Sequence, residues 1–295
     1  MGVRRAVNMA EQASGALTSG ALTSGAFTSG AFTSGAPAFS LGPLVHNPTV
    51  LAELEKCGIK TPDKLPADIN GCTLIIRAHG ISPEIEKDLR NKGARIVDAT
   101  CPNVKKSQLK VQELASKGYS LFLAGVAEHA EIEGLLGYAS RAPFCAAVAN
   151  SIAAQTAAQT AAAEIYKRDK NSKTALLGQT TISEDEYSRI GKEIKKYFPN
   201  LEIIDTICAA TADRQQALRE LLNKADAVIV AGGKDSANTR CLFSIAQDSG
   251  KPCALIEDSG EIPAAFYSYK TIGLCAGAST PDSVIDEIEK KLMIS

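Results

Sequence analysis

From residue 71 onward, short apolar runs alternate with longer stretches in which apolar positions recur every three or four residues. The runs are rich in β-branched residues, and the longer stretches have the period of amphipathic helices. Regular alternation of strand and helix predicts an α/β fold with parallel sheets covered by helices. The predicted strands cover residues 72–76, 94–97, 120–123, 174–177, 201–204, 227–230 and 271–274.

Polar residues and prolines mark where several helices should begin. Ser82 precedes Pro83 and Thr280 precedes Pro281, which predicts helices with proline in the first helical position. Ser183 with Glu186 has the spacing of a capping box. Every second strand opens a new unit, which predicts three similar small α/β domains over residues 1–100, 101–205 and 206–295.

Three further segments are distinguished by their pattern or composition. Residues 1–13 suit a short amphipathic helix. A Ser/Gly-rich pentapeptide repeat follows within residues 14–36, and its period of five, which fits neither helix nor strand, predicts a low-complexity insert that acts as a flexible linker. The Ala/Gln/Thr run over residues 153–160 predicts the extension of a surface helix.

Composition narrows the class of protein. The 295 residues carry 32 basic and 33 acidic side chains, a net charge of −1 without a polybasic stripe. Nucleic acid and membrane surfaces are therefore not expected as partners. No apolar run approaches the roughly 18 residues that span a bilayer, and the first residues are too mixed for a secretory signal. A cytoplasmic location is expected.

Eight cysteines are scattered along the chain without a Cys-x-x-Cys pair. We expect them to be reduced, and any metal must be held by cysteines that the fold brings together. Cys101 and Cys208 each stand where a strand-like run meets a helix, which is the edge where α/β folds collect ligands. Their neighbours are Asp and Thr, so a metal or catalytic role is favoured for both. Packing is the expected role of the other six.

The same edge carries imidazoles and carboxylates. All three histidines, His46, His79 and His129, follow apolar runs in predicted loops, which favours contact with a ligand. One of the neighbouring acids Glu128, Glu131 and Glu133 could act as a proton donor if burial raised its pKa. Composition alone does not choose among the three.

Small polar residues lie at three further strand-to-helix turns. They are Thr180 after one predicted strand, Ser236 and Asn238 after another, and Ser279 after the last. Such residues ordinarily cap helices, but helix amino termini also bind phosphate groups. The combined set predicts a metal-centred site for a polar or anionic small molecule.

Together these motifs closely resemble the 4-hydroxy-3-methylbut-2-enyl diphosphate reductase family. The resemblance rests on segments in the family's order across nearly the whole chain: residues 2–6, 42–47, 77–80, 98–102, 129–134, 178–181, 207–211, 236–238 and 276–279. It implies three α/β domains arranged as a trefoil around a 4Fe–4S cluster, with Cys101 and Cys208 as two of three cysteine ligands. The third is expected just before Met1.

The resemblance also implies roles for the remaining site residues. Glu131 would donate a proton, and Thr180 would order the hydroxyl end of the substrate. His129 would be a further substrate contact, and the diphosphate would be bound by His46, His79, Ser236, Asn238 and Ser279. The implied reaction gives isopentenyl and dimethylallyl diphosphate with electrons from a ferredoxin or flavodoxin-type donor.

Two alternatives remain open at this point. One is a truncated homologue with two cysteine ligands, which cannot keep a stable cluster and has no reductase activity. The other is a non-redox α/β protein that binds a phosphorylated metabolite and uses its cysteines only for packing.

Overall fold

The computed structural model describes residues 6–10, 37–44, 48–168 and 172–294. The pentapeptide repeat and His46 lie outside these ranges. The chain divides into two compact units, Met1–Pro102 and Asn103–Ser295. The first unit holds one parallel sheet and the second holds two, which confirms the predicted α/β class. The boundaries predicted for three domains, after residues 100 and 205, stay predictions.

The sheet of the first unit has the strand order β2-β1-β3-β4, and all of its strands are parallel. Residues 6–10 are helical, as predicted for the start of the chain, and Ala6 and Ala10 are buried. The elements are β1 (Ala38–Ser40), α2 (Pro48–Lys56), β2 (Ile59–Lys60), β3 (Thr73–Ile76), α3 (Pro83–Asn91) and β4 (Arg95–Asp98).

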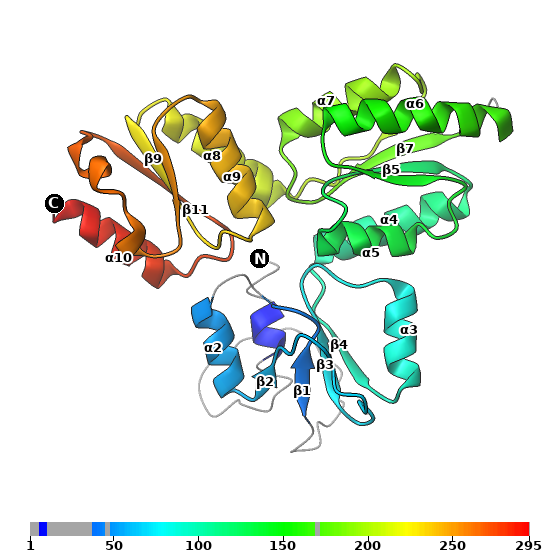
Figure 1. Ribbon diagram of the computed structural model, residues 1–295, viewed down its shortest axis with the longest axis horizontal. Helices are drawn as coiled ribbons and strands as arrows, with labels where there is room; N and C mark the ends of the chain where they lie inside the picture. Colours follow the sequence, from blue (N-terminus) through cyan, green and yellow to red (C-terminus); the bar gives the residue numbers. More distant parts are fainter. Residues whose placement is uncertain (1–5, 11–36, 45–47, 169–171, 295) are drawn as a thin grey trace. The chain divides into compact units, whose positions relative to one another are not determined.

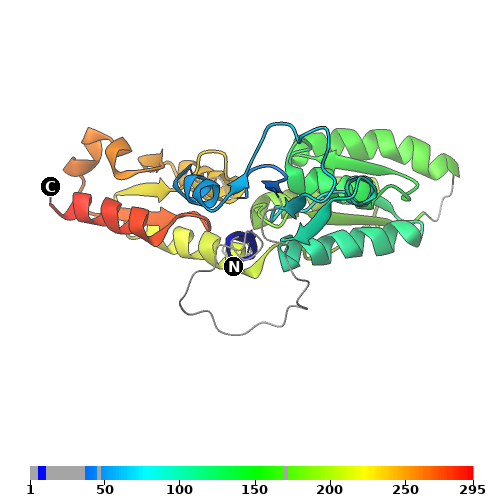
Figure 2. The ribbon, with the colours of Figure 1, turned by 90° about the horizontal axis from the view of Figure 1, so that it is seen from below.

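The second sheet has the order β6-β5-β7-β8 and is covered on both faces (Figure 1, and Figure 2 in the turned view). Leu121 and Leu123 of β5 pack with α4 and α5, whereas Phe122 packs with α6 and α7. The elements are α4 (Pro102–Ser116), β5 (Ser120–Ala124), α5 (Ala130–Tyr138), β6 (Cys145–Val148), α6 (Ser151–Arg168), β7 (Thr174–Gly178), α7 (Glu184–Lys195) and β8 (Glu202–Ile203).

The third sheet has the order β10-β9-β11. Val228 and Val230 of β9 pack with α8 and α9, and Ile229 packs in the cluster that contains Ile288 of α10. The elements are α8 (Ala209–Leu222), β9 (Ala227–Ala231), α9 (Ala237–Asp248), β10 (Cys253–Ile256), the 3-10 turns η1 (Ser259–Glu261) and η2 (Ala264–Ser268), β11 (Ile272–Ala276) and α10 (Asp282–Met293).

Two of the predicted helix starts depend on a proline. The Ser82 hydroxyl accepts a hydrogen bond from Ile85 N at 3.3 Å and caps α3, as predicted. Pro281, predicted as the first helical residue of α10, instead has extended backbone and precedes the helix. The Thr280 hydroxyl donates to Ala231 O at 3.0 Å, so it links the end of β9 to this turn and does not cap the helix.

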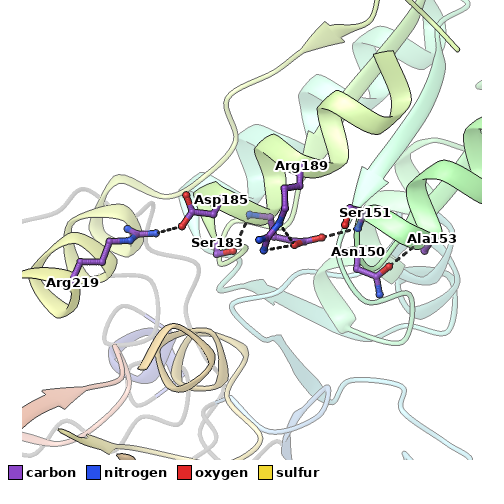
Figure 3. A network of polar contacts seen from close by, with 8 residues as sticks. Asn150, Ser151, Ala153, Ser183, Asp185, Arg189 and Arg219 are labelled. Atoms are coloured by element: carbon purple, nitrogen blue, oxygen red, sulfur yellow. Dashed lines mark hydrogen bonds and ion pairs between the residues drawn. The ribbon is translucent and has the colours of Figure 1, made fainter. Parts of the chain in front are cut away.

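The predicted capping box at α7 forms only in part (Figure 3). Glu186 N donates to Ser183 Oγ at 3.2 Å, which is the expected cap. The Glu186 carboxylate does not return to Ser183, because Oε1 accepts from Ser151 N at 2.6 Å and Oε2 pairs with Arg189. Glu186 therefore connects the start of α7 to the start of α6.

The Ala/Gln/Thr run is helical, as predicted, and lies within α6. Ala154, Ala158 and Ala161 are fully buried against the second sheet, so one face of this predicted surface helix belongs to the core. Across the described ranges, no helix has both the length and the apolar character needed to cross a membrane.

Candidate active site

Glu131 is a buried carboxylic acid in the first turn of α5. Its side chain is 1% exposed, whereas Glu128 and Glu133 are exposed to solvent. His129 is the N-cap residue of this helix, and its Nδ1 accepts a hydrogen bond from Glu131 N at 3.2 Å. Burial therefore distinguishes Glu131 from the two acids that the sequence could not separate from it.

Thr180 holds both oxygens of the Glu131 carboxyl group. Thr180 N donates to Oε1 at 2.7 Å, and the Thr180 hydroxyl donates to Oε2 at 3.0 Å. Thr180 lies in the turn that follows β7, which is closed by a bond from Ile182 N to Gln179 O at 3.0 Å. The predicted proton donor and the predicted hydroxyl-ordering residue are thus in direct contact.

The surroundings of Glu131 give its carboxyl group a pKa that suits acid–base catalysis. Burial raises its pKa from 4.5 to about 7, while the two bonds from Thr180 act in the opposite direction. A carboxyl group with a pKa near neutrality can hold a proton and release it at physiological pH. The Glu131–Thr180 pair can therefore supply one proton to a bound molecule.

Cys208 is the N-cap residue of α8 and is linked to the same turn. Its amide N donates to Thr180 O at 3.0 Å. The Cys208 side chain makes no capping bond, and its Sγ accepts a hydrogen bond from Asn103 Nδ2 at 3.1 Å. Thr180 therefore connects a predicted cluster ligand on one side with the predicted proton donor on the other.

Cys101 and His79 lie at neighbouring strand ends in the first unit. Cys101 N donates to Ala78 O at 2.9 Å, which joins the end of β4 to the turn after β3. Gly80 has φ +74°, a conformation that favours glycine, and it allows the tight turn that contains His79. Both side chains are half-buried.

The third sheet contributes a buried amide at the start of α9. Ser236 caps this helix, with Thr239 N donating to its hydroxyl at 3.4 Å. Asn238 is 6% exposed, and neither polar atom of its side chain has a hydrogen-bond partner among the residues described. Leaving a buried amide unpaired costs about 1–3 kcal/mol, which a polar ligand would recover.

Ser279 lies at the neighbouring strand end, in the turn after β11. Gly277 N donates to Ala231 O at 2.8 Å, and this bond brings the turn beside the end of β9, from which α9 follows. A Cβ on Gly277 would stand 2.2 Å from the Thr239 hydroxyl, so only glycine permits this approach. Ser279 remains half-buried.

A cavity of about 610 Å³ in the second unit is lined by turns after the strands of the second sheet and by α7 and α9. His129 and Gln179 line it from turns that follow strands of the second sheet, and Ala237 and Arg240 line it from α9. The predicted substrate contact His129 and the start of α9 therefore face one space.

The donor set fits an iron–sulfur cluster in its chemistry. Cys101 and Cys208 are free, half-buried thiols at strand-to-helix turns, and thiolates are the usual ligands of such clusters. The Asn103 amide is placed as donors commonly are around cluster sulfurs. Within the described residues, no three His, Cys, Asp or Glu side chains gather as a metal site. Burial raises the pKa of Cys145 to about 12 and that of Cys241 to about 11, which suits packing.

Two residues at the site were missed by the sequence reasoning. Asn103 contacts Cys208 from 105 residues away, a pairing that no local pattern signals. Gln215 is fully buried on α8 and contacts Ile182 and Cys241. A polar residue on the apolar face of an amphipathic helix was the one available signal for Gln215.

Comparison with known proteins identifies the family of this chain. The family model described as LytB protein matches residues 1–293. The "4-hydroxy-3-methylbut-2-enyl diphosphate reductase" of Treponema denticola is 41% identical over 260 residues, which cover 86% of this chain and 87% of the relative. The protein of the same name from Aquifex aeolicus is 33% identical over 292 residues, or 99% of this chain and 91% of the relative.

Two solved structures are also similar. The E-1-hydroxy-2-methyl-but-2-enyl-4-diphosphate reductase of Plasmodium falciparum matches with a TM-score of 0.81 and 29% identity, covering 99% of this chain and 83% of that one. An (E)-4-hydroxy-3-methyl-but-2-enyl diphosphate reductase, titled the terminal enzyme of the non-mevalonate pathway, matches with a TM-score of 0.65 and 32% identity over 100% and 95%. From its sequence and its fold, this chain belongs to the LytB protein family.

Proposed function

We propose that this chain reduces 4-hydroxy-3-methylbut-2-enyl diphosphate to isopentenyl diphosphate and dimethylallyl diphosphate, the last step of the non-mevalonate isoprenoid pathway. Family membership and the names of the relatives support this activity. The structural observation that carries it is the buried Glu131 carboxyl group, bound by Thr180, whose carbonyl accepts from Cys208 N.

Cys101 and Cys208 would hold two irons of a 4Fe–4S cluster. When bound, the cluster supplies low-potential electrons and an open, Lewis-acidic iron for the substrate hydroxyl. The Asn103 amide would stabilise the negative charge on the Cys208 sulfur by its hydrogen bond.

Glu131 would protonate the departing oxygen. The reaction breaks one C–O bond and consumes two electrons and two protons, releasing water and leaving a C–H bond in its place. A carboxyl group with a pKa of about 7 is substantially protonated at neutral pH and can provide the first of these protons. Thr180 holds the carboxyl group by both oxygens and thereby fixes its direction.

The diphosphate would be bound by hydrogen-bond donors at the amino-terminal ends of helices. Ser236 and Asn238 at the start of α9 have this placement in the second unit, and His129 at the start of α5 is proposed as a further substrate contact. Ser279 lies in the turn before α10. Hydrogen bonds to charged groups contribute about 1.5–3 kcal/mol each, so a few donors suffice for an anion. His46 and His79 are proposed for the same role from their motifs alone.

The electron donor and the cellular location stay predictions. A ferredoxin or a flavodoxin-type protein is proposed as the donor because the reaction needs low-potential electrons delivered one at a time. The predicted location is the cytoplasm.

The activity is tested with the full chain prepared without air and supplied with iron and sulfide. Incubation with the allylic diphosphate and a strong chemical reductant should yield both five-carbon diphosphates, and omission of the reductant should yield neither. Substrate that binds but remains unchanged would instead indicate the non-redox binding protein, an alternative that the named relatives do not favour.

A further inference from the structure

We infer that Gln215 is a positioning residue that holds the Gln179–Ile182 turn, and with it Thr180, against the Glu131 carboxyl group. The inference deepens the proposed function and rests on the proposed role of Glu131 as proton donor. Gln215 lies two helical turns beyond Cys208 on α8, so both residues face the same side of the helix.

The contacts of Gln215 join three elements of the site. Its Nε2 donates to Ile182 O at 3.2 Å, at the residue that closes the turn after β7. The same atom lies 3.5 Å from Cys241 Sγ on α9, the helix that begins at Ser236 and Asn238. One amide therefore connects α8, the Thr180 turn and α9.

Gln215 makes one of several hydrogen bonds that hold this turn in place. Gly178 N, at the start, donates to the Thr206 hydroxyl at 2.7 Å. In the middle, Thr180 O accepts from Cys208 N at 3.0 Å. At the end, Ile182 O accepts from Gln215, and one turn farther along α8 Arg219 pairs with Asp185 at 2.9 Å (Figure 3).

The contact with Ile182 differs in kind from the Arg219–Asp185 ion pair. Asp185 is largely exposed, and exposed ion pairs hold their partners weakly. Gln215 is 0% exposed, so its bond to Ile182 O does not compete with water. The buried amide is therefore the firmer of the two attachments at the end of the turn.

The side-chain amide of Gln215 is paired through its nitrogen but not through its oxygen. Its Oε1 has no hydrogen-bond partner within the described ranges, although it is buried. An unpaired buried oxygen destabilises the fold, and an apolar side chain of similar size would avoid this penalty. The amide is therefore present although its oxygen is unpaired, and its bond to Ile182 O is the contact that accounts for it.

The expected consequence of losing the amide appears at Glu131. Without the bond to Ile182 O, the turn can relax, and the two bonds from Thr180 to the carboxylate lengthen. Within the part of the chain that the structure describes, burial and these two bonds are the causes of the shift in the Glu131 pKa. Because the Thr180 bonds favour the ionised form, weakening them raises the pKa further.

The test compares Gln215→Met with Gln216→Met in the full chain carrying its cluster. Gln216 is the matched control because it is exposed and its side chain donates to Glu220 on its own helix. The protonated carboxyl band of Glu131, assigned as the band lost in Glu131→Gln, is titrated by infrared difference spectroscopy. Gln215→Met should raise the midpoint by about half a pH unit, and Gln216→Met should leave it unchanged.

Measuring kcat and KM of the same variants gives a second test. Gln215→Met should lower kcat about tenfold while KM stays within twofold, because the acid is misplaced and the diphosphate donors are untouched. A midpoint equal to that of the unmodified chain, or the same shift in Gln216→Met, overturns the inference. General destabilisation alone would lower the melting temperature without moving the midpoint.

Failure of the proposed function would be seen separately. A chain without reductase activity still reports the infrared midpoint, so the positioning of Glu131 is decided independently of turnover. If Gln215→Met does not fold, Gln215→Asn is used, which keeps the amide but withdraws it by one methylene group. An upward shift in Gln215→Asn supports the inference, and an unchanged midpoint overturns it.

Discussion

Thr180 donates to both oxygens of the Glu131 carboxyl group, from its backbone N at 2.7 Å and from its hydroxyl at 3.0 Å. The two residues are 49 positions apart and meet because β5 and β7 are neighbouring parallel strands whose carboxyl ends share one edge. Burial favours the protonated form of this acid, and the two hydrogen bonds from Thr180 partly offset that effect by stabilising the ionised form. The pair is thus balanced for proton transfer near neutral pH.

Replacing Thr180 by valine should shift the pH dependence of turnover. Thr180→Val keeps the shape and the backbone bond but removes the hydroxyl donor, which lowers the Glu131 pKa in the unmodified chain. The pKa should therefore rise from about 7 by on the order of one unit. A proton donor loses activity as pH rises through its pKa, so the basic limb of the kcat profile should move to higher pH. An unmoved limb would exclude this hydroxyl from control of the acid.

The stability of the chain should fall with rising pH because of Glu131. Its pKa is raised from 4.5 in the unfolded chain to about 7, so between these values the folded state holds a proton that the unfolded state has released. This rise corresponds to about 3 kcal/mol. Glu131→Gln lacks the titration, and its amide can still bond Thr180 through both atoms.

Urea unfolding of the two chains at pH 5 and pH 8 measures this difference. Relative to Glu131→Gln, the unmodified chain should lose up to about 3 kcal/mol of unfolding free energy between the two pH values. If the difference in unfolding free energy between the two chains is the same at both pH values, burial does not raise the pKa of Glu131.

Replacing Asn238 by leucine should weaken substrate binding without lowering the stability of the free protein. Asn238→Leu removes a buried amide without partners in the described part of the chain, so the free protein should be as stable as before or more stable. If the amide binds the diphosphate, KM should rise about tenfold or more, since the lost hydrogen bond is to a charged group. Asn200→Leu, at an exposed position, serves as the control. Unchanged KM in Asn238→Leu would remove Asn238 from the site.

The two proposed cluster cysteines should control the iron content. Cys101→Ala and Cys208→Ala should each lose most of the iron, sulfide and visible absorption of the anaerobically purified chain, because each removes a thiolate ligand. Cys57→Ala provides the control, since Cys57 lies in the turn after α2, away from the strand ends that carry the site. Full iron content in either of the first two variants would refute that residue as a ligand.

The central strands were predictable because their burial on both faces produces continuous apolar runs. β5, β7 and β9 are such strands, and each is fully buried. The edge strands β6 and β10 were not predicted, because each has four residues, of which only one is β-branched. In the first sheet, β3 and β4 were predicted, whereas β1 and β2 were not.

The predicted site residues belong to motifs at the ends of strands. In a parallel sheet these ends lie at one edge, so the sequence alone could place the motifs there. Burial of Glu131 and the unpaired amide of Asn238 depend on tertiary packing, so the sequence could name these residues but could not show their state. Asn103 and Gln215 were missed because their partners Cys208 and Ile182 are 105 and 33 residues away. His46 lies outside the described residues, and its predicted role stays a prediction.

The most direct test is the turnover of Glu131→Gln in the full chain, prepared without air with its cluster and assayed with the allylic diphosphate and a strong reductant. Glutamine keeps the size and the contacts with Thr180 but cannot donate the proton, so kcat should fall at least about a hundredfold. Iron content and substrate affinity should match those of the unmodified chain. Turnover within a few-fold of the unmodified chain would contradict the assignment of Glu131 as the proton donor.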